Sequence, residues 1–230
     1  MANLESSRKF WQKKATENPY WYVSSYGSYH NRNMIEFWAS GVSIWKDIRV
    51  KIGYQPKPTD SVVEIGCGVG RLSRAMSGEV GRIDAFDISQ QMLDIAKQAG
   101  LPNVTFQLSK GDNLQPLQDS SADFILAYCV FQHLPSLDVL RNYVGEMARV
   151  AKLGSICAFT LTPRTWRDNL QPLMKLKGRI RDLWSNGPKG LSADEWIGIR
   201  PTVEQVRALS RWPMQVVSMG NERLLFWFVR

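Results

Sequence analysis

Apolar residues follow a helical spacing at the start of the chain and come in short runs after it. Residues 5–17 and 33–52 have apolar side chains three and four positions apart, which predicts two amphipathic helices. The second helix is expected to bury a stripe formed by Phe37, Trp38, Val42, Ile44, Trp45 and Ile48. The segment KPTD at 57–60 then ends the helical pattern.

From residue 61 onward, short apolar runs alternate with amphipathic segments. The runs predict strands at SVVEIG, RIDAFDIS, NVTFQLS, ADFILAYCV and SICAFTLT. The segments between them predict helices at RLSRAMSG, closed by Gly78, at SQQMLDIAKQAG, from Ser89 to Gly100, and at DVLRNYVGEMARVAKLG, ending at Gly154. This alternation predicts an α/β fold with an open parallel sheet covered by helices on both faces.

The last third of the chain has a different pattern. Residues 163–200 form an irregular basic segment that is longer than a simple crossover requires. A helix is then predicted at TVEQVRALSR, and two strands are predicted at QVVSMG and RLLFWFVR. The two strands lie close enough in the sequence to pair as an antiparallel ribbon at the edge of the sheet.

The composition fits one globular domain and argues against several other classes. The chain has 230 residues, of which 44% are hydrophobic and 22% charged, enough for one sizeable core. It has no run of the roughly 18 apolar residues that a membrane span needs, and its N-terminus lacks a secretory signal, so a cytoplasmic location is expected. Its three cysteines are far apart and it has only two histidines, which predicts neither disulfides nor a metal centre.

The net charge of +8 is concentrated in one stretch. Between Pro163 and Gly190 there are seven basic and two acidic residues, a local excess of five positive charges. A positive patch of this kind attracts phosphate, carboxylate or nucleic acid. A solvated basic helix is the alternative, and the sequence leaves both interpretations open.

The first predicted strand leads into a loop with three glycines two residues apart, VVEIGCGVGRLSRAM. Gly66, Gly68 and Gly70 allow a sharp turn and close approach of a ligand, because no Cβ intervenes. The dinucleotide fingerprint is not met, since Arg71 and Ser73 occupy the positions where its last glycine would stand. No Gly-Lys-Ser or Gly-Lys-Thr follows, which also disfavours a P-loop. A ligand without a pyrophosphate fits better, and a purely structural turn is the alternative.

Polar residues follow the strands at the same edge of the predicted sheet. Glu64 ends an otherwise apolar strand, so its burial requires a partner such as a ligand ammonium or a loop N–H. Asp87 ends the second strand, where a carboxylate accepts both hydroxyls of a ribose; capping the helix near Ser89 is the alternative. Asp112 and Asn113 follow the third strand, where they could read an adenine edge.

Four segments, in this order and spacing, resemble the class I S-adenosylmethionine-dependent methyltransferases: EIGCGVGRLS, FDIS, GDNLQPL and FILAYCVFQHLPS. The resemblance covers roughly residues 60–160. It implies S-adenosyl-L-methionine as cofactor and S-adenosyl-L-homocysteine as product. The cofactor-binding residues that we predict are Tyr22, Glu64, Gly66, Cys67, Gly68, Gly70, Arg71, Asp87, Ile88, Met92, Asp112, Asn113, Leu114 and Cys129.

The family places these groups around different parts of the cofactor. Glu64 and the glycines would surround the methionine part, and Asp87 the ribose. Ile88 would lie against the adenine and Asp112 and Asn113 at its amino side. Met92 would pack beneath the ring, with a core methionine as the alternative.

The resemblance also implies how the domain is organised. We expect a single domain over 1–230 with a Rossmann-like, seven-stranded, mostly parallel sheet, one antiparallel edge strand and helices on both faces. Its expected parts are an N-terminal helical lid at 1–55, a cofactor-binding core at 60–160, an inserted substrate cap at 163–200, and a C-terminal helix with an edge hairpin at 201–230.

His133 is the candidate catalytic base for an acceptor hydroxyl or amine, because it follows the fourth strand and histidine titrates near neutrality. A histidine that only fixes the loop is the alternative. The aromatic string NPYWYVSSYGSYH resembles a lid that excludes water. Candidate substrate contacts are Tyr26, Trp166, Arg167, Trp196 and Arg200, with a surface helix resting on its tryptophans as the alternative.

The predicted activity is methyl transfer to an O or N atom of a small molecule such as a natural product, sugar or lipid-linked intermediate. An anionic acceptor is left open, as is the oligomeric state. A nucleic-acid or protein methyltransferase is the first alternative; nucleic acid is disfavoured, because AYCV stands where many nucleic-acid enzymes carry Asn/Asp-Pro-Pro-aromatic. A protein that binds S-adenosylmethionine without turnover is the second.

Overall fold

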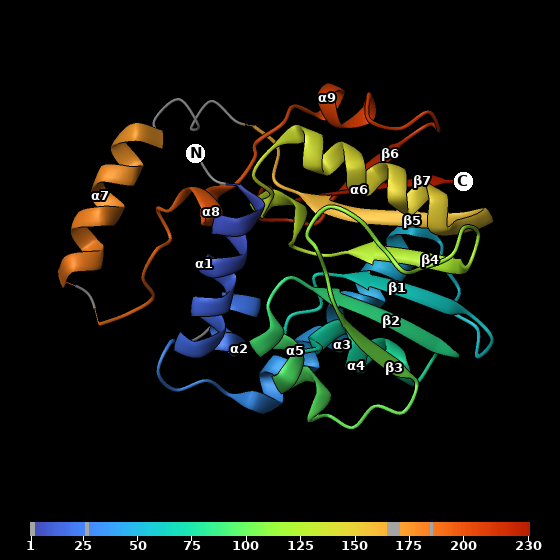
Figure 1. Cartoon of the computed structure of the whole chain (residues 1–230), viewed down its shortest axis with the longest axis horizontal. Helices are drawn as coiled ribbons and strands as arrows, with labels where there is room; N and C mark the ends of the chain where they lie inside the picture. The colour runs from blue at the N-terminus through green and yellow to red at the C-terminus, as the bar shows by residue number, and fades with distance from the viewer. Residues whose placement is uncertain (1–2, 26–27, 165–170, 185) are drawn as a thin grey trace.

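The strands of the computed structural model form one sheet. The structure describes residues 3–25, 28–164, 171–184 and 186–230. Its strands are β1 (Ser61–Ile65), β2 (Arg82–Asp87), β3 (Val104–Leu108), β4 (Ala122–Ala127), β5 (Ala151–Leu161), β6 (Gln215–Ser218) and β7 (Leu224–Val229). Their order across the sheet is β3-β2-β1-β4-β5-β7-β6 (Figure 1).

Strands β1 to β5 are parallel to one another, β7 is antiparallel to β5, and β6 is antiparallel to β7. The predicted fold class is confirmed. The reversed strand, β7, is the last but one of the sheet, and β6 forms the edge. Ile65, the last residue of β1, pairs with Phe86 of β2 and Ala127 of β4. Consequently the carboxyl ends of these three strands lie side by side, where open α/β sheets bind ligands.

Helices cover both faces of the sheet and its carboxyl edge (Figure 1). They are α1 (Leu4–Glu17), α2 (Pro19–Val23), α3 (Met34–Ile52), α4 (Arg71–Ser77), α5 (Gln90–Lys97), α6 (Leu137–Val150), α7 (Gln171–Trp184), α8 (Asp194–Ile197) and α9 (Val203–Arg207), with a 3-10 turn η1 (Phe131–His133). On one face, Trp45 and Ile48 of α3 and Met76 of α4 pack with Phe124 of the sheet. None of the described helices is both long and apolar enough to cross a bilayer.

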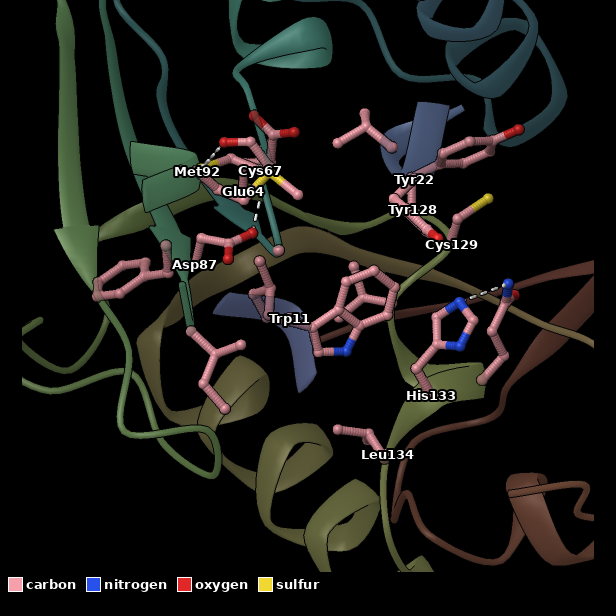
Figure 2. A pocket seen from close by; sticks show the side chains of 18 of the residues that line it. Trp11, Tyr22, Glu64, Cys67, Asp87, Met92, Tyr128, Cys129, His133 and Leu134 are labelled. Atoms are coloured by element: carbon pink, nitrogen blue, oxygen red, sulfur yellow. Dashed lines mark hydrogen bonds between the residues drawn. The ribbon is translucent and has the colours of Figure 1, made fainter. Parts of the chain in front are cut away.

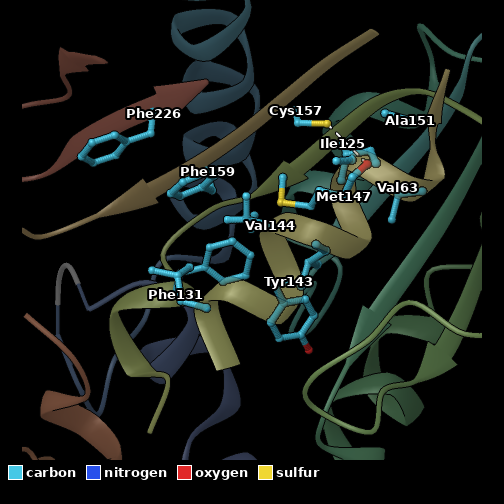
Figure 3. Packing of buried hydrophobic residues seen from close by; sticks show 14 of the residues in the cluster. Val63, Ile125, Phe131, Tyr143, Val144, Met147, Ala151, Cys157, Phe159 and Phe226 are labelled. Carbon is cyan, nitrogen blue, oxygen red and sulfur yellow. Dashed lines mark hydrogen bonds between the residues drawn. The ribbon is translucent and has the colours of Figure 1, made fainter. Parts of the chain in front are cut away.

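An aromatic core on the face covered by α6 fixes the loop that follows β4 (Figure 3). The ring of Phe131, in η1, lies 5.2 Å from Tyr143 of α6 and 5.3 Å from Phe159 of β5. Phe159 stacks in turn on Phe226 of β7, at 5.6 Å. All four rings are at most 4% exposed. The site loop at η1 is therefore anchored by burial of large aromatic surfaces.

The predicted boundaries need four corrections. The helix expected to run to Gly154 ends at Val150, and residues 151–154 begin β5 instead. Here pairing overrides helix propensity: Ala151 pairs with Ala122, and the Gly154 N–H donates to the carbonyl of Arg230. The helix expected to run from Ser89 to Gly100 covers only 90–97, strand β4 stops three residues early, and the irregular basic segment contains α7 and α8.

Candidate functional site

The glycine turn after β1 is hydrogen-bonded directly to the end of β2. The N–H groups of Gly66 and Cys67 both donate to the carbonyl of Phe86, at 2.7 and 2.9 Å. The Gly68 N–H donates to Oδ2 of Asp87 at 2.8 Å, and the Ser89 N–H donates to Oδ1 at 2.9 Å. Gly66 and Gly68 have φ values of 72° and 55°, which favour glycine. The turn and the carboxylate thus form one structural unit.

A cavity of about 550 Å³ opens at this unit, within the size range of small-molecule sites. Twelve of the predicted site residues line it: Tyr22, Glu64, Gly66, Cys67, Gly68, Arg71, Asp87, Ile88, Met92, Cys129, His133 and Trp196. Figure 2 shows the side chains of Glu64, Cys67, Met92 and Asp87 on one side of the cavity, Tyr128, Cys129 and His133 on the other, and Trp11 between them.

Two valine side chains lie against the glycines. A Cβ on Gly66 would be 2.2 Å from Val130, which follows β4, and a Cβ on Gly68 would be 2.6 Å from Val23 of α2. Any larger side chain would therefore displace the loop after β4 or helix α2. The absence of a Cβ at both positions keeps the backbone of the turn on the cavity wall.

Glu64 is a buried carboxylate that accepts hydrogen bonds from the hydroxyl and the main chain of Ser73. Burial raises the pKa of Glu64 to about 7, and the guanidinium of Arg71 and the bond from Ser73 offset only part of this. Asp87 is also desolvated, which raises its pKa to about 6 despite main-chain hydrogen bonds from Ser89, Gly68 and Ile88. A cationic ligand group in the cavity would restore the ionised state of Glu64.

The end of the cavity near β3 is built by residues that the sequence did not suggest. Ser109, Gly111, Leu134 and Tyr143 line it together with Ile88. The Gly111 N–H donates to the Oγ of Ser109 at 2.9 Å, and that Oγ lies 3.2 Å from the hydroxyl of Tyr143.

Five predicted site residues do not line the cavity. Asn113 donates to Asp112 at 2.7 Å, and both lie outside the lining, while Leu114 is fully buried in the core. Gly70 begins α4 with φ of 80°, and its Cα faces Ala96 and Phe106. Arg200 is also outside the lining. Tyr26, Trp166 and Arg167 lie outside the described residues.

A cluster of aromatic residues borders the cavity, and Trp196 of α8 lies at the centre of the cluster. The rings of Trp11, Trp21, Tyr22 and His133 are all within 6.4 Å of the Trp196 ring. The backbone of Gly198, with φ of 56°, presses on residues 132 and 133, because a Cβ there would be 2.0 Å from the Gln132 carbonyl. Residues of α1, α2, η1 and α8 therefore meet at the wall of one cavity.

His133 is held at both ring nitrogens. Its Nδ1–H donates to the carbonyl of Trp196 at 2.5 Å, so Nε2 is the acceptor and lies 3.3 Å from the amide nitrogen of Gln132. Burial lowers the pKa of His133 to about 4. The ring is therefore neutral and a weak base at neutral pH, and this geometry favours the interpretation in which it fixes the loop.

Two arginines belong to the wall of the cavity. Arg223, in the turn before β7, donates to the hydroxyl of Tyr128 at 3.0 Å and stacks over its ring. Arg71, which is 5% exposed, donates to Ser40 of α3 at 2.9 Å and keeps a buried Nε without a hydrogen-bond partner.

Cys129 lies between these cations and the glycine turn in a left-handed conformation, with φ of 61°. Its N–H donates to the hydroxyl of Thr160 on β5 at 2.7 Å. Non-glycine residues in this region are strained and concentrate at functional sites. Cys129 was predicted as a cofactor-binding residue, and it lies in the fourth segment that carries the family resemblance, FILAYCVFQHLPS.

Comparison with known proteins identifies the fold and the domain. A family model described as "Methyltransferase domain" matches residues 63–159. Demethylmenaquinone methyltransferase of Bacillus licheniformis is 30% identical over 126 residues, which cover 52% of this chain and 52% of that protein. A probable tocopherol O-methyltransferase of rice, Oryza sativa subsp. japonica, is 32% identical over 125 residues, or 50% of this chain and 32% of that protein.

The chain thus spans about half the length of the first relative and about a third of the second. Among solved structures, magnesium protoporphyrin IX methyltransferase from Synechocystis PCC 6803, crystallised with SAH, matches with a TM-score of 0.63 and 17% identity over 99% of this chain and 100% of that chain. The prediction of a methyltransferase domain is therefore confirmed for residues 63–159, and the chain shares the fold of this solved methyltransferase.

Proposed function

We propose that the chain transfers a methyl group from S-adenosylmethionine to an O or N atom of a small molecule. The observation that carries the proposal is the direct bond between the Gly68 N–H and Asp87 in the wall of one cavity. The names of the relatives, which refer to demethylmenaquinone, tocopherol and magnesium protoporphyrin IX, support a small acceptor. The proposed compartment is the cytoplasm, which the free thiols of Cys67, Cys129 and Cys157 support.

The residues of the cavity fit the parts of this cofactor. Glu64 suits its ammonium, and Arg71, with an unpartnered Nε, suits its carboxylate. Asp87 keeps acceptor capacity for the ribose hydroxyls, because a carboxylate offers about four acceptor sites and main-chain donors do not fill them all. Ile88, Met92 and Gly111 offer an apolar, closely approachable surface for the adenine.

The bound cofactor supplies an activated methyl group on a sulfonium, so the protein contributes mainly alignment and exclusion of water. The aromatic lid around Trp196 excludes water. In this proposal His133 holds Trp196 and the loop after β4 in place, since its pKa of about 4 makes it a poor base. An acceptor that is already deprotonated would need no base.

The acceptor that we propose carries an anionic group. Arg223 and Tyr128 line the cavity, and Asn221 adds an amide. A carboxylate or phosphate would receive charge-assisted hydrogen bonds there.

Replacing Arg223 with methionine should lower kcat/KM for the acceptor roughly 10- to 100-fold, because one charge-assisted hydrogen bond of about 1.5–3 kcal/mol is lost. The affinity for S-adenosylmethionine should stay at the wild-type value. Arg211→Met is the matched control, since Arg211 also stacks on an aromatic ring, that of Trp212, and does not line the cavity. Equal acceptor kinetics for the two variants would remove Arg223 from the acceptor site.

Labelled S-adenosylmethionine tests the activity itself. The protein is incubated with the labelled cofactor and a cell extract separated into metabolites, nucleic acid and protein. We expect the label in the metabolite fraction. The unmethylated acceptor should be retained on an anion exchanger. Label found only with nucleic acid or protein would refute the small acceptor, and cofactor binding without any transfer would indicate a binding protein.

The affinity for S-adenosylmethionine should fall as the pH is lowered below about 7. Above the pKa of Glu64, about 7, the carboxylate is ionised and ready for the ammonium, whereas below it each bound cofactor must displace a proton. One titrating group gives about a tenfold loss per pH unit, and Asp87 adds to it below about pH 6. Titration calorimetry between about pH 5.5 and 7.5 measures this.

Glu64→Gln is the control, because the amide has the same shape and does not titrate. Its affinity should be lower at pH 7.5 and nearly independent of pH between about 6 and 7.5. The folding stability of the cofactor-free protein should depend on pH in the opposite direction. The raised pKa of Glu64 stabilises the fold below the pKa of the unfolded state, and this contribution is lost as the pH rises through about 7. A pH profile unchanged by Glu64→Gln would contradict the assignment.

A further inference from the structure

Helix α7 carries a row of large apolar side chains that face solvent. Leu176, Ile180 and Trp184 are four residues apart, so they lie on one side of the helix. Their exposed fractions are 56%, 52% and 86%. We name these three residues the α7 apolar row. Single exposed apolar residues are ordinary, but a row of this kind on one helix face indicates an interaction surface.

The opposite side of α7 faces the protein. A Cβ on Gly178 would be only 2.5 Å from the Cβ of Ser192, so the helix packs on the segment before α8 through Gly178. Gly178 is two residues from both Leu176 and Ile180, which places it about 160° away from each around the helix. The α7 apolar row therefore points away from the molecule, and Figure 1 shows α7 at its outer edge, beyond α8.

Basic side chains border the α7 apolar row on both sides. Helical spacing places Lys177 and Arg181 along one border and Lys175 and Arg179 along the other. Lys177, Arg179 and Arg181 are exposed. Asp182 is the only acidic residue of the helix, and Arg181 pairs with it at 3.0 Å, while Lys175 pairs with Asp194 at 2.5 Å.

We propose that α7 docks on the surface of an anionic lipid bilayer and lies in the plane of its headgroups. Its apolar row would enter the boundary between headgroups and acyl chains, where tryptophan is favoured, and its lysines and arginines would reach the lipid phosphates. A nucleic acid would bind the cations and leave the apolar row in water. A second copy of the chain would cover the row but bring a second set of cations against the first.

Docking would also orient the proposed active site. Helices α7 and α8 belong to the same inserted segment, and α8 carries Trp196, which lines the cavity. The lid would thus lie next to the lipid surface, where an amphiphilic acceptor with an anionic group is concentrated. The α7 apolar row and its basic borders do not line the cavity. Docking on lipid can therefore be tested without measuring catalysis.

Vesicles of phosphatidylglycerol mixed with phosphatidylcholine test the docking by co-sedimentation, with phosphatidylcholine vesicles as the uncharged comparison. We expect binding to the anionic vesicles that weakens with added salt. The triple variant Leu176→Ser, Ile180→Ser, Trp184→Ser should lose roughly tenfold or more of the partition coefficient. For the double variant Lys177→Glu, Arg181→Glu, the partition coefficient should fall roughly fivefold for each cation replaced.

The matched control is Ile35→Ser, Val50→Ser, Leu153→Ser, which removes three exposed apolar side chains that lie outside α7. It should bind vesicles like the wild type. Equal binding by the two triple variants, or no binding of the wild type to anionic vesicles, would overturn the proposal. So would binding to a DNA duplex that survives the α7 triple substitution, or a dimer in solution that the substitution dissociates. Unchanged cofactor affinity in every variant separates this result from the proposed activity.

Discussion

Asp87→Ala is expected to weaken S-adenosylmethionine binding by roughly 10²- to 10⁴-fold. Two hydrogen bonds from the ribose to a carboxylate are lost, at about 1.5–3 kcal/mol each. The variant also leaves the Gly68 and Ser89 N–H groups without their acceptor, so the glycine turn keeps only its main-chain bonds to Phe86 of β2. Titration calorimetry of the cofactor against the variant measures the change.

Asp84→Ala is the control for this variant. Asp84 is on the same strand, three residues earlier, and bonds to Gln107 and Arg82 instead of lining the cavity. Its cofactor affinity should match the wild type. Asp87→Asn keeps the shape and one oxygen acceptor, so it should fall between alanine and wild type. Retention of full affinity by Asp87→Ala, with an unchanged thermal unfolding temperature, would refute the cofactor site.

The glycine turn and Asp87 could be predicted because the residues that form them are local in sequence. Each comes directly after an apolar strand, and parallel strands bring their carboxyl ends to one edge. Asp112 and Asn113 were predicted by the same rule, yet their loop turns so that the preceding residue, Gly111, reaches the cavity. The position of a side chain one residue further along a loop depends on turn geometry, which the sequence pattern does not specify.

The lid could be predicted only in part. The aromatic string and the tryptophans of the inserted segment were candidates, but the contact of His133 with Trp196 joins residues 63 positions apart. Arg223 comes from the turn before β7, and no local pattern distinguishes it from a surface arginine. Val42 was expected in the buried stripe and is 58% exposed, because α3 buries the face formed by Phe37, Gly41 and Trp45. Such long-range packing decides which face of a helix is covered.

Gly68→Val should abolish detectable S-adenosylmethionine binding. Gly68 has φ of 55°, which a β-branched residue adopts only at a large cost. Its Cβ would be 2.6 Å from Val23 of the lid, and its side chain would stand on the cavity wall beside Asp87. The valine would therefore occupy the space at the turn where the cofactor binds. It would also displace α2 from the cavity. Calorimetry measures the affinity, and thermal unfolding measures the cost to the fold.

Two further variants separate these causes. Gly100→Val places the same residue at φ of 60° with no atom within 4 Å of the new Cβ, so it measures backbone strain alone. Gly68→Val combined with Val23→Ala relieves the contact with α2 but still fills the turn. If the turn receives the cofactor, binding stays absent in the double variant and is normal in Gly100→Val. Recovery of binding in the double variant would mean that Gly68 serves the lid, and the cofactor would have to lie elsewhere in the cavity.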